Sequence, residues 1–149
     1  MAEQRLVLIV VGSHLRAETH DRAIAYRLRE RVLASLERRF GPEKPGKPHP
    51  LAPVVCSDLW FMNNESLRRR PTVSVGGPEV NALTAYLADK LPSVLAVDDV
   101  YLVQADPEYD EVVACCWGAD ASATLAATDA FADRFLEAFL DAAVRVGAA

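Results

Sequence analysis

The sequence predicts an α/β fold, a three-layer Rossmann-like sandwich around a mixed, mostly parallel sheet with a C-terminal antiparallel hairpin. The first observation is the run 6–11, which is apolar at every position, as is typical of a strand buried on both faces. The second is the alternation of such runs with segments of helical periodicity. The third is the short link 105–110 between the last two predicted strands, which cannot form a parallel crossover.

Composition bounds the domain and its partners. The chain has 149 residues, of which 51% are hydrophobic and 25% charged, so we expect one globular α/β domain spanning 1–149. The formal net charge of −5 makes nucleic acid an unlikely partner class. Apolar runs stay well below the ~20 residues that cross a bilayer, so no membrane partner is expected.

The cysteines and the N-terminus predict a cytoplasmic location. The N-terminus lacks the basic region and apolar stretch of a signal peptide. Cys56, Cys115 and Cys116 lie in apolar, strand-like runs, and this odd count fits reduced, buried thiols. Since neighbours in a strand face opposite sides, Cys115 and Cys116 should not form a redox pair.

The first half should contain one helix between two strands. The strand at 6–11 ends at Gly12-Ser13-His14, and a helix is expected at 19–40 because apolar residues recur at every fourth position. These residues are Ile24, Leu28, Val32, Leu36 and Phe40. The arginines of this helix form either a solvated face or a site for a phosphate or an acidic partner. The second strand and its exit follow at 54–62.

A proline-rich segment separates these elements. Residues 41–53 hold five of the nine prolines, which predicts a mobile surface loop outside helix and sheet. His49 within it is expected to be exposed.

The middle of the chain reads as a strand, a diglycine turn and a helix. The strand is 72–75, and Pro78 occupies the expected first helical position, where no amide donor is needed. Helical spacing continues to Leu91, and Pro92 ends it. Such a turn at a helix start favours an anion or a polar ligand.

The last third should form a hairpin and a helix. Strands are expected at 99–104 and 111–117, and the final helix at 121–146, capped by Asp120 or Ser122. Its wide apolar face belongs on the sheet or at a subunit interface, so a homodimer is a candidate assembly.

The carboxyl ends of parallel strands meet at one edge, where α/β proteins bind ligands. The candidate ligand-binding residues at these ends are Ser13, His14, Asp58, Trp60, Gly76, Gly77 and Asn81. If catalysis occurs, His14 is the candidate general base and Asp58 an orienting or acidic group. The alternatives are a capping Asp58, a core Trp60, and an Asn81 that binds a neighbouring loop.

No metal site is predicted, and no cofactor is identified. His14, His20 and Asp21, with Cys56 and Asp58, are metal-binding residue types, but no close ligand pair is present. Cys56 with His14 could form a thiolate–imidazole nucleophile, whereas a buried structural cysteine is the alternative.

Two motifs of the second half resemble a known family. Gly76-Gly77-Pro78-Glu79-Val80-Asn81, and later Gly118-Ala119-Asp120-Ala121-Ser122-Ala123-Thr124, resemble the GGPxxN and GxxAxxT signatures of archaeal surface-layer-like α/β modules. The resemblance implies a Rossmann-like module whose diglycine turn lies near the N-terminus of the last helix. It does not imply a location, because this chain carries a single copy and no signal peptide.

Two functions therefore remain. The chain binds a small polar or phosphate-bearing ligand at the strand ends, with or without a reaction. Alternatively, it is a non-catalytic interaction or assembly module that forms homo-oligomers.

Overall fold

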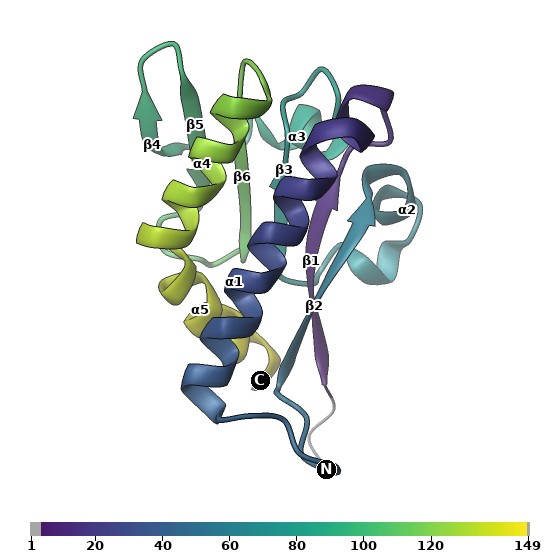
Figure 1. Ribbon diagram of the computed structural model, residues 1–149, viewed down its shortest axis with the longest axis vertical. Coiled ribbons are helices and arrows are strands. Elements are labelled where there is room, and N and C mark those ends of the chain that lie inside the picture. The colour runs from purple at the N-terminus through teal and green to yellow at the C-terminus, as the bar shows by residue number, and fades with distance from the viewer. Residues whose placement is uncertain (1–3, 149) are drawn as a thin grey trace.

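The computed structural model describes residues 4–148, which contain a six-stranded sheet of order β2-β1-β3-β6-β5-β4 (Figure 1). Its strands are β1 (Arg5–Val11), β2 (Leu51–Ser57), β3 (Thr72–Val75), β4 (Ser93–Val97), β5 (Tyr101–Ala105) and β6 (Val113–Gly118). Strand β1 pairs in parallel with β2 and β3, and β3 with β6, whereas β4–β5 and β5–β6 are antiparallel. The predicted α/β class with a mixed, mostly parallel sheet is confirmed.

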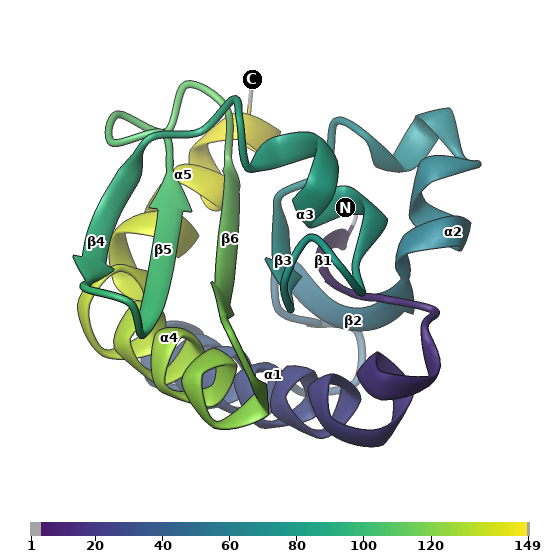
Figure 2. The same cartoon turned by 90° about the horizontal axis from the view of Figure 1, so that it is seen from above.

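Helices lie on both faces of this sheet (Figure 2). Helices α1 (Arg22–Phe40) and α4 (Ala121–Arg134) lie side by side on one face, and α2 (Asp58–Met62) and α3 (Ala82–Leu87) lie on the other. A π-helix, η1 (Ala17–Asp21), precedes α1, a 3₁₀ turn, η2 (Glu65–Leu67), follows α2, and α5 (Leu136–Ala148) ends the chain. Within residues 4–148, no helix combines the length and apolarity needed to cross a membrane.

The buried apolar residues form two clusters, one on each face of the sheet. Alternate residues of β1 enter them, with Val7, Ile9 and Val11 in the larger cluster and Leu8 and Val10 in the smaller one. The adjacent cysteines divide in the same way, since Cys116 joins the larger cluster and Cys115 the smaller. Their predicted opposite orientation is confirmed.

The predicted C-terminal hairpin is present as β5–β6, but it is joined by a strand that the sequence reasoning missed. Strand β4 follows Pro92 directly and pairs antiparallel with β5, with a register shift between Ser93 and Leu95. Four of its five residues are apolar, although only Val94 and Leu95 are half-buried, so the sequence does carry a strand signal that was overlooked. The free edge of β5 supplies the pairing that makes it a strand.

The helix after β3 begins later than predicted. Pro78 is not its first residue, because the Gly77 carbonyl accepts the amides of Val80 and Asn81 in a turn. Asn81 is the N-cap of α3, and its side-chain oxygen accepts the amides of Leu83 and Thr84. The helix ends at Leu87, so the periodicity toward Leu91 continues as turns.

The proline-rich segment is shorter and better anchored than predicted. Strand β2 begins at Leu51 and includes Pro53, which a sheet tolerates because β2 is an edge strand. His49 is 7% exposed, and its Nε2 lies 2.7 Å from the Gly41 carbonyl oxygen. The expectation of an exposed His49 was therefore wrong, while Phe40, assigned to the buried stripe, is 47% exposed.

The predicted final helix is two helices. Phe135 leaves the helical region at φ −122°, and α5 continues in a new direction that closes one end of the core. Phe139 packs edge-on against Phe131, with 5.6 Å between the ring centroids, and against Tyr109 of the β5–β6 loop, with 5.8 Å between the centroids. The apolar face is thus buried within one chain, and it offers no support for a subunit interface on this helix.

The polar face of α4 and α5 meets the arginines of α1. Arg27 binds Asp129, Arg31 binds Asp133, and Ser35 donates to Glu137, with the same sequence offset each time. Arg39 completes the row with bonds to Asp141 and Glu137. We call this row the α1–α4/α5 ladder. Several arginines thus bind acidic residues of the same chain.

Candidate functional site

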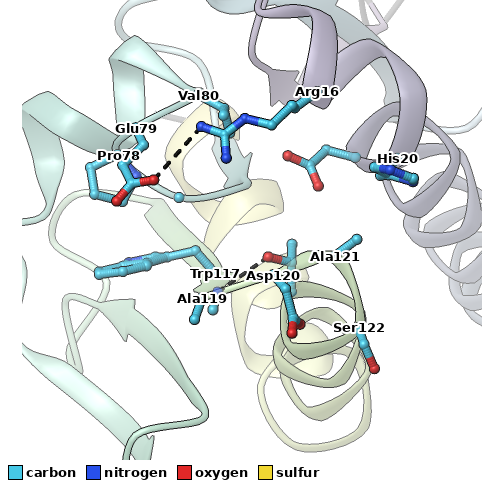
Figure 3. Close-up of a pocket in the computed structure, with 14 residues that line it drawn as sticks. Arg16, His20, Pro78, Glu79, Val80, Trp117, Ala119, Asp120, Ala121 and Ser122 are labelled. Carbon is cyan, nitrogen blue, oxygen red and sulfur yellow. Dashed lines mark hydrogen bonds and ion pairs between the residues drawn. The ribbon is translucent and has the colours of Figure 1, made fainter.

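The main pocket lies at the carboxyl edge of the parallel strands, where the segments after β1, β3 and β6 meet (Figure 3). Its volume is about 500 Å³. The chain leaves β1 toward one face and β3 toward the other, which opens a crevice of the kind that binds ligands in α/β sheets. The lining residues are Arg16, His20, Asp21, Gly77, Pro78, Glu79, Val80, Trp117, Gly118, Ala119, Asp120, Ala121, Ser122 and Thr124.

Two strand-end glycines allow these segments to approach closely. Gly76 has φ +109°, and a Cβ there would lie 2.5 Å from Oδ2 of Asp21. A Cβ on Gly118 would lie 2.4 Å from that of Ala123 in α4. Glycine at both positions therefore sets the shape of the pocket wall.

Asp21 is the buried charge of the pocket. Its residue surface is only 6% exposed, and none of residues 4–148 forms a hydrogen bond or an ion pair with its carboxylate. Burial raises the pKa of Asp21, although the charges of His20 and Arg16 act in the opposite direction. The fully enclosed polar atoms without a partner among residues 4–148 do not include the oxygens of Asp21, so its carboxylate opens onto the pocket, where water or a ligand can donate to it.

The backbone that presents Asp21 is also unusual. Asp21 is the last residue of the π-helix η1, and α1 follows at once. Single π turns inside helices are rare and occur often at functional sites, because the extra residue redirects the side chains.

The remaining charges lie around the mouth. The guanidinium of Arg16 extends toward Glu79, with 3.7 Å between nitrogen and oxygen, and both side chains are mostly exposed (Figure 3). His20 is an exposed residue of the same helical segment. A pair this exposed contributes little stability, so Arg16 remains available to a ligand.

The N-terminus of α4 forms the opposite wall. Oδ1 of Asp120 accepts the Ala123 amide at 2.8 Å, and the Thr124 hydroxyl accepts the Gly118 amide at 3.2 Å. The amides of Ala121 and Ser122 have no acceptor inside the helix, because they belong to its first turn. The expected helix cap at Asp120 is confirmed.

The structure places Asp58 and Ser13 in a separate hydrogen-bonded junction. Oδ1 of Asp58 accepts the Ser13 amide, the Ser13 hydroxyl and the Leu59 amide, and Oδ2 accepts the Ala82 amide at 2.8 Å. Asp58 is 4% exposed. It thus ties the loop after β1 to the starts of α2 and α3, and neither residue lines the pocket.

Asn81 is fully engaged by backbone groups. Besides capping α3, its amide nitrogen donates to the carbonyls of Val10 and Val75. This is the neighbouring-loop alternative considered for Asn81.

The other predicted residues divide between the pocket and the surface. Gly77 lines the pocket, and Gly76 lies directly behind it against Asp21. His14 is exposed outside the lining, where its Nδ1 accepts the Arg16 amide at 3.1 Å. Trp60 is 47% exposed on α2, which fits neither the core position nor a place in this pocket.

The surface-layer-like resemblance placed the start of the last helix near the diglycine turn, but the segment after β6 was not included among the predicted ligand-binding residues. Asp120 and Ser122 were considered only as helix caps, and Asp21 only as a metal ligand. A strand followed by glycine occurs three times, at Gly12, Gly76 and Gly118, and the third instance would have added residues 119–122 to the expected edge.

The remaining chemistry-bearing residues do not form a reactive cluster. Burial raises the pKa of Cys56 to about 11, so its thiol is a poor nucleophile at neutral pH. Burial likewise raises the pKa of Cys115 to about 12. In the part of the chain that the structure describes, no group of three or more His, Cys, Asp or Glu residues could hold a metal ion.

No family model matches this chain, and no curated protein is significantly similar to it.

Proposed function

We propose that this protein binds a small polar ligand in the pocket at the carboxyl edge of β1, β3 and β6. The observation that carries the proposal is the carboxylate of Asp21, a residue that is only 6% exposed, whose oxygens open onto the pocket and have no donor among residues 4–148. The proposal concerns binding, and it assigns no residue a catalytic role.

The pocket has suitable dimensions and polarity. Its volume of about 500 Å³ lies within the range of roughly 300–1,000 Å³ that is usual for small-molecule sites. A ligand hydroxyl or ammonium group would donate to Asp21 and compensate for the desolvation of its charge.

Native mass spectrometry of the freshly purified protein tests this proposal. We expect a retained mass that disappears when the same sample is denatured. The variant Asp21→Asn should lose that mass, whereas the exposed Asp110→Asn in the β5–β6 loop should retain it. Retention of the same mass by Asp21→Asn would contradict the proposal. The spectra also report subunit number, and therefore test the homo-oligomer alternative.

A protein that retains no ligand can be tested by ¹⁵N–¹H correlation spectra with a library of polar fragments. We expect shifts at the amides of Gly77, Ala121 and Ser122. Fragments that shift only the amide signals of residues outside the pocket would argue against the site.

We infer further that the sheet belongs to a three-layer Rossmann-like sandwich, because helices lie on both of its faces. The surface-layer-like resemblance is supported by one contact, since a Cβ on Gly77 would lie 3.6 Å from the Gly118 carbonyl oxygen. A reducing, cytoplasmic location is supported by the three free, buried cysteines.

A further inference from the structure

The pocket has two polar walls of opposite character. One wall carries the Asp21 carboxylate, which requires a donor. The other is the N-terminus of α4, a helix of 14 residues, where Ala121 and Ser122 line the pocket. A helix of this length concentrates positive potential at its first turn, where free amides accept an anion.

The acidic residues near the α4 wall, Asp120 and Glu79, each have one partner. The Asp120 carboxylate accepts the Ala123 amide. The Glu79 carboxylate faces Arg16 at the mouth, and its side chain is 81% exposed. The Arg16 side chain is 64% exposed, so it can turn from Glu79 to an anion at little cost.

We propose that the ligand carries an oxyanion and a hydroxyl group together, with the oxyanion at the α4 N-terminus and Arg16, and the hydroxyl donating to Asp21. This deepens the proposed function and rests on it. A hydroxylated phosphate ester and a hydroxy acid share this chemistry. The buried carboxylate makes a simple anion a poor ligand, because an anion without a donor would face Asp21 unfavourably.

Isothermal titration calorimetry with four probes tests the pairing of the two groups. The probes are D-ribose 5-phosphate, D-gluconate, D-ribose and inorganic phosphate. We expect ribose 5-phosphate or gluconate to bind at least tenfold more tightly than ribose and inorganic phosphate. Which of the two binds identifies the oxyanion as phosphate or carboxylate. Equal binding of ribose and ribose 5-phosphate, or no binding of either hydroxylated anion, would overturn the proposal.

The variant Ala121→Pro tests the α4 wall. Proline is favoured at the first helical position, and it removes only the Ala121 amide donor. Asp120 already has φ −143° and ψ 179°, the extended conformation that a following proline requires. We expect the affinity for the bound hydroxylated anion to fall at least tenfold while the unfolding temperature stays close to that of the wild type.

The exposed Arg16→Gln provides a second variant that does not depend on helix geometry, and we expect a loss of about fivefold or more. Asp110→Asn serves as the control, because Asp110 is an exposed residue of the β5–β6 loop outside the pocket lining. If neither Ala121→Pro nor Arg16→Gln changes the affinity while Asp21→Asn abolishes binding, the oxyanion assignment fails and the pocket proposal stands. If Asp21→Asn also binds normally, both fail.

Discussion

At the scale of single residues, two positions at the pocket are under unusual physical constraint. Asp21 holds a carboxylate in a place that penalises its charge, and Gly76 adopts a conformation that other residues rarely reach. Each gives a prediction.

The stability effect of Asp21→Asn should depend on pH. Because the folded pKa of Asp21 is raised, the folded state binds this proton more tightly than the unfolded state, whose pKa is near 3.8. Asp21 therefore destabilises the fold above its folded pKa, and the penalty disappears as pH falls toward 3.8. In ligand-free protein, the stability of the variant relative to wild type should be higher at pH 7 than at pH 4. Urea unfolding at both pH values measures this difference, with Asp110→Asn as reference, and a gap that does not change with pH would contradict it.

Gly76→Ala should cost more than Gly41→Ala. Both glycines have positive φ, at +109° and +76°, so each substitution introduces strain of roughly 1–3 kcal/mol. A Cβ on Gly76 would collide with Oδ2 of Asp21, whereas a Cβ on Gly41 would meet no atom within 4 Å. Chemical denaturation of both variants measures the difference. The double variant Gly76→Ala/Asp21→Ala should recover part of the extra cost, and equal costs for the two single substitutions would show that the contact is unimportant.

At the scale of elements, the ladder between α1 and α4/α5 fixes how two parallel helices lie on the sheet. Its members are spaced four residues apart on both sides, so each turn of one helix meets a turn of the other. The pKa of Glu137 is lowered by the hydrogen bond from Ser35 and by the charges of Arg39 and Arg38. The ladder should therefore weaken in acid, as Glu137 protonates.

A double-mutant cycle should find the strongest coupling at the most buried rung. The Arg39 side chain is only 20% exposed and binds Asp141 and Glu137, so coupling of Arg39 to Asp141 should be about 1–2 kcal/mol. The Arg27–Asp129 pair is far more exposed, at 58% for Arg27, and should couple less. In 1 M NaCl the Arg27 pair should lose most of its coupling. A stronger Arg27 pair would contradict this ranking.

At the scale of the whole molecule, α5 closes the end of the core opposite the pocket. Phe139 is fully buried against Phe131 and Tyr109, which come from α4 and from the β5–β6 loop. These two contacts join α5 to α4 and to the β5–β6 loop, so this closure holds the antiparallel part of the sheet to its helices.

Phe139→Ala should lower the free energy of unfolding by about 3–5 kcal/mol, since it leaves a cavity in this closure. Val146→Ala on the same helix is the control, because Val146 is 48% exposed and its loss should cost no more than about 0.5 kcal/mol. Thermal and urea unfolding measure the free energy of unfolding of both variants. Similar small effects of the two variants would mean that α5 does not seal the core.

Much of the fold could be predicted because local pattern suffices for it. The uniformly apolar run 6–11 predicted a central strand, and β1 lies between β2 and β3. The brevity of the 105–110 link predicted the β5–β6 hairpin, and Asp120 before an alanine-rich segment predicted the cap of α4. These features depend on neighbours in sequence, which a single sequence displays.

The rest depended on contacts across the chain. The break at Phe135 depends on the packing of α5 beneath the core. The carboxyl edge was predicted, but not which side chains would face a cavity there. The side chains of Asp58 and Asn81 form hydrogen bonds with backbone groups of other segments, while the Asp21 carboxylate has no donor among residues 4–148.

The sequence by itself determined the class of fold and the edge of the sheet at which the pocket lies, because periodicity and strand order follow from local chemistry. Only the tertiary structure decided that Asp21 and the start of α4 form the pocket. Residues 21 and 121 are a hundred positions apart, and the packing of α1 beside α4 brings them to one place.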